Sequence, residues 1–259
     1  MKSLASQKEL RGARDPGFCY VCGRTWTEAD ETNRDHVPPA KLFAPSDLEK
    51  GPLVLRTHVT CNNGYSRYDE HVAQLVSLLW KVEPGPEDVS SLRVSLHEPE
   101  GKAPFGAVEG LELQSIIARW LRGFHAALYG EFLPRGGGYI FPPLPGADLV
   151  GQDTMLHVSH PVLVREVRKN RIARTIDSVV SCGGACRYEC VWSHLDSGRP
   201  ICIFALDLYA WERLGDVNNF PARSCVGWYE VPGRIPPGAS LATRLEFPVD
   251  NREPLRAFD

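Results

Sequence analysis

Cysteine and histidine residues near the start of the chain have the spacing of a metal site. Cys19 and Cys22 are separated by two residues, and His58 and Cys61 repeat that spacing downstream. Thiolate and imidazole ligands suit Zn²⁺ in tetrahedral geometry, and a two-residue gap lets one tight turn present both side chains to one ion. The pattern predicts a structural zinc site. The alternative is that His58 is an exposed strand residue and the three cysteines are simply buried.

An acid, a base and an amide lie close to these four residues in the chain. Asp35 and His36 fall between the two halves of the predicted zinc site, and Asn62 directly follows Cys61. A neutral imidazole can activate water near pH 7, whereas carboxylate and amide oxygens are ligands that Mg²⁺ accepts. We therefore expect zinc binding to bring Asn62 close to Asp35 and to leave His36 free as a general base. These groups meet the demands of phosphodiester hydrolysis.

The motifs CxxC, DHVPP, CNN and SxxDE, which fall within about residues 18–80, together resemble the HNH endonuclease family. The resemblance implies a ββα-metal module with a zinc knuckle that cleaves phosphodiester bonds of nucleic acid with Mg²⁺ or Mn²⁺. It implies that His36 is the general base and that Asp35 and Asn62 bind the catalytic cation. It also implies products with 5′-phosphate and 3′-hydroxyl ends.

The chain departs from the family pattern at several positions. His58 stands where the family usually has a cysteine, and no asparagine lies between His36 and Cys61 to orient the base. Ser66 stands where a further ligand of the catalytic metal is often found. Asp69 lies seven residues after Asn62, on about the same face of a helix, so it is a second candidate for that role, as is its neighbour Glu70.

Duplex DNA is the expected substrate of such an enzyme, and RNA is left open as a partner. One centre of this type cuts one strand, so nicking and double-strand cutting both stay open. A homodimer would pair two such centres, and an activating protein partner is the other option. Bacterial restriction or phage defence is the expected biological setting. The alternative function is a catalytically inactive, zinc-stabilised module that binds nucleic acid or protein.

Hydrophobic periodicity predicts the elements that must position these residues. Residues 53–59 have the composition of a strand, and residues 63–80 have apolar side chains at helical spacing. Residues 91–98 resemble a strand, and residues 110–130 form the clearest amphipathic helix, with Gly130 as its stop. Further predictions are a helix over residues 160–180 and a β-hairpin over residues 187–195 and 200–211.

The expected fold class is α+β in successive parts. Residues 1–17 are polar and basic and are expected to be a flexible arm. Residues 18–82 would form the HNH nuclease module, and residues 83–259 a mixed α+β accessory domain of unknown role. A linker is expected at residues 81–90, and the last forty residues, rich in proline and glycine, are expected to wrap the surface.

Basic residues concentrate in one segment of the second part. They are Arg165, Arg168, Lys169, Arg171 and Arg174. Phosphate contacts supply most non-specific affinity for DNA, so this segment is a candidate nucleic-acid contact, with an ordinary solvated helix face as the alternative. In the helix over residues 110–130, Arg119, Arg122 and His125 are expected on the solvated side.

A second series of potential metal ligands recurs every four residues, at Cys182, Cys186, Cys190 and His194. The segment resembles a strand, in which that spacing separates side chains by roughly 13 Å, too far for one ion. We therefore predict scattered buried cysteines, and we interpret Cys202 and Cys225 in the same way.

Composition limits the class of protein without naming a function. The chain has 259 residues, of which 43% are hydrophobic and 24% charged, as in globular proteins with a real core. A formal net charge of −3 provides no overall basic surface for nucleic acid, so any contact must be local. Because no apolar run is long enough for a membrane and the N-terminal residues lack a secretory signal, we expect a cytoplasmic protein with reduced cysteines.

Overall fold

The computed structural model describes residues 1–80, 93–97, 105–109, 113–134, 138–141, 154–195, 197–209, 224–231 and 233–242. Helices and strands are mixed along the chain, which confirms the α+β class. The strands are β1 (Ser3–Leu4), β2 (Thr32–His36), β3 (Val54–His58), β4 (Arg93–His97), β5 (Phe105–Glu109), β6 (Gly138–Phe141), β7 (Asp177–Ser181), β8 (Cys186–His194), β9 (Pro200–Leu208) and β10 (Ser224–Glu230). The α-helices are α1 (Gln7–Gly12), α2 (Pro45–Leu48), α3 (Val59–Asn63), α4 (Ser66–Trp80), α5 (Leu113–Tyr129) and α6 (Thr154–Ile172).

A six-stranded sheet with the order β1-β7-β8-β9-β10-β6 forms the centre of the molecule. Only the β1–β7 pair is parallel among these described strands. Side chains alternate between its two faces, as strand geometry requires. In β9, Cys202, Phe204 and Leu206 point to one hydrophobic cluster, and Ile203 and Ala205 point to the other.

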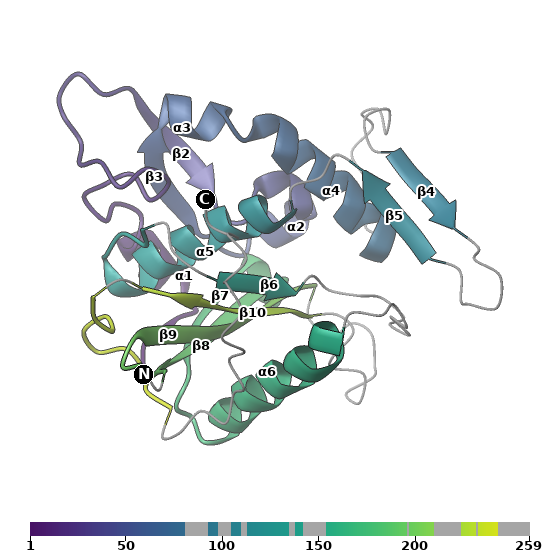
Figure 1. The fold of residues 1–259 in the computed structure, drawn as a ribbon. Helices are drawn as coiled ribbons and strands as arrows, with labels where there is room; N and C mark the ends of the chain where they lie inside the picture. Colours follow the sequence, from purple (N-terminus) through teal and green to yellow (C-terminus); the bar gives the residue numbers. More distant parts are fainter. Residues whose placement is uncertain are drawn as a thin grey trace.

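Helices cover both faces of this sheet (Figure 1). Helix α5 contributes Ile116, Trp120 and Phe124 to the larger cluster, whereas α6 contributes Leu163 and Val167 to the smaller one. Figure 1 also shows that α5 lies between the sheet and the segment that contains β2, β3, α3 and α4. One face of α5 therefore packs on the sheet while another faces the N-terminal segment.

The N-terminal segment is a β-hairpin followed by two helices. Strands β2 and β3 are antiparallel, with Asp35 opposite Leu55 and His36 opposite Val54. Helix α5 approaches the end of β2 closely, because a Cβ atom on Gly123 would lie 2.7 Å from Cγ1 of Val37. A helix can come this near only where it has no side chain in the way.

Residues 1–17 differ from the flexible arm that the sequence suggested. Strand β1 pairs with β7, with Ser3 opposite Ser178, and α1 begins with a capping box formed by Ser6 and Glu9. Leu10 is 2% exposed and belongs to the larger hydrophobic cluster. A polar segment is held here because a neighbouring strand supplies hydrogen bonds and the helix buries one apolar residue.

Other sequence predictions have mixed outcomes. The structure confirms the hairpin of β8 and β9 and the strands β3 and β4. It also confirms that α5 ends before Gly130, which has a φ of +66°. The predicted helix over residues 160–180 was wrong in its second half, because α6 ends at Ile172 and β7 begins at Asp177. Strand β10 lies inside the sheet, which corrects the prediction that the last forty residues only wrap the surface. The predicted linker at residues 81–90 lies outside the described residues.

In the described part of the chain, no helix is both long enough and apolar enough to cross a membrane.

Candidate metal centre and the adjoining arginine cluster

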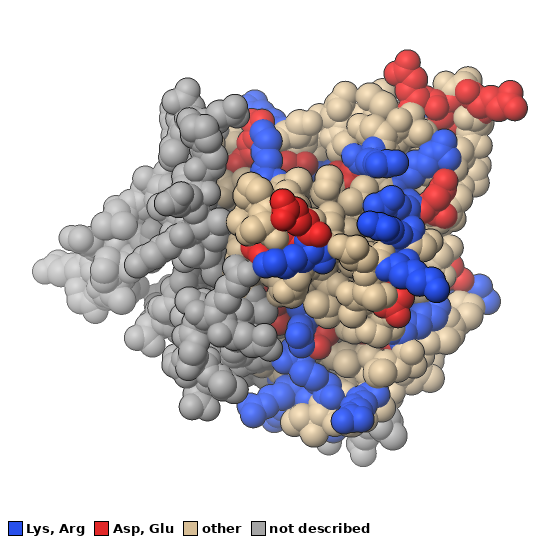
Figure 2. Space-filling model, turned by 180° about the vertical axis from the view of Figure 1, so that it is seen from behind, with Lys and Arg blue, Asp and Glu red and all other residues tan. Residues whose placement is uncertain are grey.

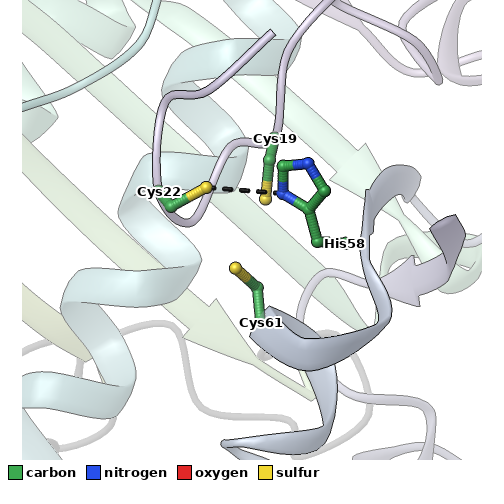
Figure 3. Close-up of side chains that lie close together, drawn as sticks. All are labelled: Cys19, Cys22, His58 and Cys61. Atoms are coloured by element: carbon green, nitrogen blue, oxygen red, sulfur yellow. Dashed lines mark hydrogen bonds between the residues drawn. The ribbon is translucent and has the colours of Figure 1, made fainter. Parts of the chain in front are cut away.

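The predicted zinc ligands come together in space. Ligand atoms of Cys19, Cys22, His58 and Cys61 all lie within 4.8 Å of one another. Figure 3 shows the four side chains pointing toward a common centre, and Nδ1 of His58 is 3.4 Å from Sγ of Cys22. Three sulfurs and one imidazole nitrogen are a donor set that zinc accepts in tetrahedral geometry. This group, called the tetrad below, could hold a metal ion such as zinc.

Local turns present the tetrad from two segments. Gly23, with a φ of +78°, closes the turn after Cys22, and its amide donates to the carbonyl of Cys19 at 2.7 Å. In the second segment, β3 ends at His58 and α3 begins at Val59, so the first turn of α3 carries Cys61 back toward His58. Each pair is thus held by a turn of its own, and a shared ion would join the two segments.

Electrostatics favours a cation among these thiols. Burial raises the pKa of Cys19, but hydrogen bonds from the Thr57 hydroxyl and from backbone amides outweigh it and lower the pKa to about 6. Burial and the charge of Cys19 raise the pKa of the Cys61 thiol. One thiolate therefore opposes the formation of a second. A bound cation would remove that penalty, because the thiolate form is the metal ligand.

A carboxylate lies close to the histidine of the tetrad. Oδ1 of Asp30 lies 3.5 Å from Nε2 of His58, on the side of the ring opposite the tetrad. The other carboxylate oxygen of Asp30 accepts hydrogen bonds from the amide and hydroxyl of Thr27, both at 2.8 Å. A carboxylate behind a ligating histidine fixes the ring and its tautomer. Nε2 of His58 makes no hydrogen bond among the described residues, so Asp30 lies on the side of the ring where such a carboxylate would act but does not hydrogen-bond to it.

A second cluster forms beside the tetrad, around the guanidinium of Arg119 in α5. Nη1 of Arg119 donates to both carboxylate oxygens of Asp69, at 2.8 and 2.9 Å. Nη2 donates to Oδ2 of Asp35 at 2.5 Å and to Oδ1 of Asn62 at 3.2 Å. The guanidinium also lies over the ring of Tyr65, 4.7 Å from its centroid. These residues, called the arginine cluster below, include three of the predicted ligands of the catalytic cation.

The charged side chains of the arginine cluster are buried, whereas Asn62 and Tyr65 are half-buried. Arg119 is 0% exposed, and Asp35 and Asp69 are also buried. Tyr20 donates a hydrogen bond from its hydroxyl to Asp35, and burial beside this carboxylate raises the pKa of Tyr20 well above its usual value. Burial alone would lower the pKa of Arg119, but Tyr20, Asp35 and Asp69 raise it, so the guanidinium stays charged. Burial also raises the pKa of Asp69, against the opposing effect of Arg119.

The predicted general base lies next to this cluster. Asp35 and His36 are adjacent in β2, so Asp35 points to the interior and His36 to the outer face, on which it is half-buried. Burial lowers the pKa of His36, and the charge of Asp35 partly offsets that effect. A histidine with a lowered pKa is neutral near pH 7, which is the form that accepts a proton.

Ser66 and Glu70, the other predicted ligands of the catalytic cation, are less closely associated with the arginine cluster. Ser66 is exposed at the start of α4, and within the described residues no hydrogen bond joins it to the arginine cluster. Glu70 is exposed and pairs with Lys41 at 2.7 Å. Asp69 is therefore the member of the SxxDE motif that reaches the cluster.

Sequence reasoning missed Arg119. It and its neighbours Arg122 and His125 were expected on a solvated side of the helix, but they are 0%, 7% and 1% exposed. The signal was present in the apolar residues that flank them, because a helix with apolar side chains nearly all round is a buried helix. These three side chains are buried because α5 packs against the sheet on one side and against the N-terminal segment on the other.

The predicted basic segment lies elsewhere, on α6. Arg165, Arg168, Lys169 and Arg174 are exposed there, whereas Arg171 pairs with Glu189 in β8. Because α6 covers the face of the sheet away from α5, these residues are separated from Asp35 and His36 by the sheet (Figure 1). The second cysteine series is buried as predicted, at Cys182, Cys186, Cys190, Cys202 and Cys225.

Comparison of the chain with protein-family models, with curated proteins and with solved structures gave no significant match. The functional argument therefore depends on the residues and their geometry.

Proposed function

We propose that this protein is a metal-dependent endonuclease of the HNH type that hydrolyses phosphodiester bonds in nucleic acid. The observation that carries the proposal is the convergence of Asp35 and Asn62 on a single point. One oxygen of each side chain contacts the same nitrogen atom, at 2.5 and 3.2 Å, beside the half-buried His36. A base next to a pair of oxygen donors for a cation is the arrangement that phosphodiester hydrolysis needs.

Asp35 and Asn62 are suitable ligands for Mg²⁺ or Mn²⁺, because carboxylate and amide oxygens are the donors that hard cations prefer. The guanidinium nitrogen that they contact is itself cationic, which supports a positive charge at this point. Asp69 would be the third donor, and when bound the cation would neutralise charge on the departing 3′-oxygen.

His36 has the central chemical role in this proposal. Its neutral imidazole accepts a proton from a water molecule, whose oxygen then bonds to the phosphorus while the bond from phosphorus to the 3′-oxygen breaks. The departing 3′-oxygen takes a proton from solvent, so the products are a 5′-phosphate and a 3′-hydroxyl. The outer face of β2, where the His36 side chain is half-buried, leaves the imidazole accessible to water.

The same face of the hairpin offers phosphate contacts. Arg34 lies two residues before His36 on the same side of β2, and it stands directly opposite Arg56 of β3. Arg56 also pairs with Asp15 at 3.0 Å and lies over the Trp26 ring, which offsets its repulsion of Arg34. The exposed Arg34 is therefore the stronger candidate for a phosphate contact. Figure 2 shows Lys and Arg side chains over the region of α1 and this hairpin, with Asp and Glu side chains among them. We propose that the substrate backbone lies here, with the α6 segment as a separate contact.

A plasmid assay tests the proposal. Zinc-loaded protein is incubated with supercoiled DNA and Mg²⁺ or Mn²⁺, and we expect nicked or linear product from the unaltered chain. His36→Ala should reduce the rate by 10²-fold or more, in line with general-base catalysis. His194→Ala, which alters an exposed histidine at the end of β8, is the matched control. Equal, undetectable cleavage by all three proteins across several divalent ions, with RNA also tried, would reject the enzyme.

The second candidate function is a non-catalytic, zinc-stabilised module that binds nucleic acid or protein. The specific observation in its favour is that Arg119 already satisfies Asp35, Asn62 and Asp69. This candidate predicts DNA binding that Arg34→Gln weakens and that needs no divalent ion. Cleavage that starts only when cell extract is added would instead favour an activating partner.

A further inference from the structure

Arg119 occupies the point where the proposed catalytic cation would bind. Its two terminal nitrogens use Oδ2 of Asp35, Oδ1 of Asn62 and both carboxylate oxygens of Asp69. A divalent cation that binds these oxygens directly and a guanidinium in hydrogen-bonding contact with them cannot share the same space. Either occupant supplies the positive charge that two buried carboxylates require.

We propose that Arg119 and a divalent cation compete for Asp35, Asn62 and Asp69, so that the site binds metal only when the arginine leaves. This inference rests on the proposed function, because it concerns the same oxygen donors. It assigns to α5 a role that the sequence did not suggest. The helix holds the site in a metal-free form.

The contacts of α5 make Arg119 a well-anchored competitor. Trp120 and Phe124 on the same helix are 2% and 0% exposed, and Gly123 packs directly against Val37. The guanidinium is further held by the Tyr65 ring. Because hydrogen bonds from a charged guanidinium to carboxylates are stronger than neutral ones, the metal must offset their loss as well as its own dehydration. Weak metal binding by the unaltered protein is the consequence.

The competition can be measured without any assay of activity. Mn²⁺ binding to the zinc-loaded full chain is followed by the electron paramagnetic resonance signal of free Mn²⁺. We expect Arg119→Gln to bind Mn²⁺ at least tenfold more tightly than the unaltered protein. The double variant Asp35→Asn with Arg119→Gln should lose this gain, because a ligand is removed. Mn²⁺ should also raise the Tm of Arg119→Gln by more than that of the unaltered chain.

Circular dichroism and zinc content show whether Arg119→Gln folds. If it does not, Arg119→Lys is used in its place. A lysine is a compact charge that cannot bridge both carboxylates as the guanidinium does, so Mn²⁺ affinity should rise several-fold. Equal Mn²⁺ affinity in the unaltered chain and the folded Arg119 variants, or weaker binding in the variants, overturns the competition.

The outcome is distinguishable from failure of the proposed function. Tighter Mn²⁺ binding by Arg119→Gln, with no DNA cleavage by any variant, supports the competition and rejects the nuclease. Cleavage by the unaltered chain, with unchanged Mn²⁺ affinity in the variants, does the reverse.

Discussion

The tetrad and the arginine cluster are two sets of cation-binding groups that lie side by side and differ in how their charge is balanced. In the tetrad, the donor atoms of Cys19, Cys22, His58 and Cys61 face one another across a space of less than 4.8 Å. In the arginine cluster, Asp35 and Asp69 face the guanidinium of Arg119. The tetrad has the exposed guanidinium of Arg24 beside Cys22 and could bind a further cation from solution, whereas in the arginine cluster the protein itself supplies a buried cation.

Residue types and spacing that predict a metal site can therefore lead to two different structures. Both groups were predicted to bind metal from the types and spacing of their residues. Soft thiolates have no cationic side chain that could replace zinc with four bonds in tetrahedral geometry. Carboxylates do have one, since a guanidinium matches their geometry with two parallel hydrogen bonds. A predicted oxygen-donor site therefore has to be checked for an arginine before a metal is assigned.

Loss of the tetrad should have the largest effect. Cys61→Ser should remove bound zinc and unfold residues 18–63, because structural zinc contributes about 10 kcal/mol or more in small zinc modules. Elemental analysis and hydrogen exchange of this segment would measure both changes. Cys225→Ser, which alters a buried cysteine of the sheet, should retain one zinc per chain. Full zinc content in Cys61→Ser would remove Cys61 from the tetrad.

Loss of the Arg119 guanidinium should have the second-largest effect. Without divalent ions, Arg119→Gln should lower the free energy of unfolding by about 3–5 kcal/mol, because the buried carboxylates of Asp35 and Asp69 lose the cation that they share. Urea denaturation at pH 7 measures the change. Asp69→Asn in the same chain should restore part of the loss by removing one charge. A loss below about 1 kcal/mol would mean that the two carboxylates are not dependent on the guanidinium.

Removal of the Asp30 charge should have an intermediate effect, on the affinity of the tetrad for zinc. Asp30→Asn should weaken zinc binding by about 10- to 100-fold, since the contact with His58 loses its charge. Competition with a chromogenic chelator measures the affinity. Glu28→Gln, an exposed change in the same loop, should leave it unaltered. Identical affinities in these two variants would show that His58 is held without Asp30.

The close approach of α5 should have the smallest effect of the four. Gly123→Ala should destabilise the protein by about 1–3 kcal/mol, because the new Cβ would lie 2.7 Å from Val37. Val37→Ala in the same chain should relieve the contact. Gly12→Ala, where the structure describes no heavy atom within 4 Å of the new Cβ, is the control in thermal unfolding. A Gly123→Ala protein as stable as the control would mean that α5 can shift without cost.

The tetrad and much of the local structure could be predicted from residues that are close together in the chain. Each half of the tetrad has its two ligands separated by two residues, so a single turn brings them together whatever the rest of the chain does. The hairpin of β8 and β9 and the helix α5 were likewise predictable, because alternation and helical periodicity are properties of neighbouring residues. The α+β class follows from these elements.

The contacts of Asp35, Asn62 and Asp69 depend instead on long-range packing. Arg119 lies 84 residues from Asp35 and 50 from Asp69 along the chain, and its position depends on α5 packing against two partners at once. The strands β1, β7 and β10 were missed for a related reason, since their pairing satisfies backbone groups through distant neighbours rather than through a local pattern. Local spacing can gather the ligands of a metal, but long-range packing determines which cation they meet.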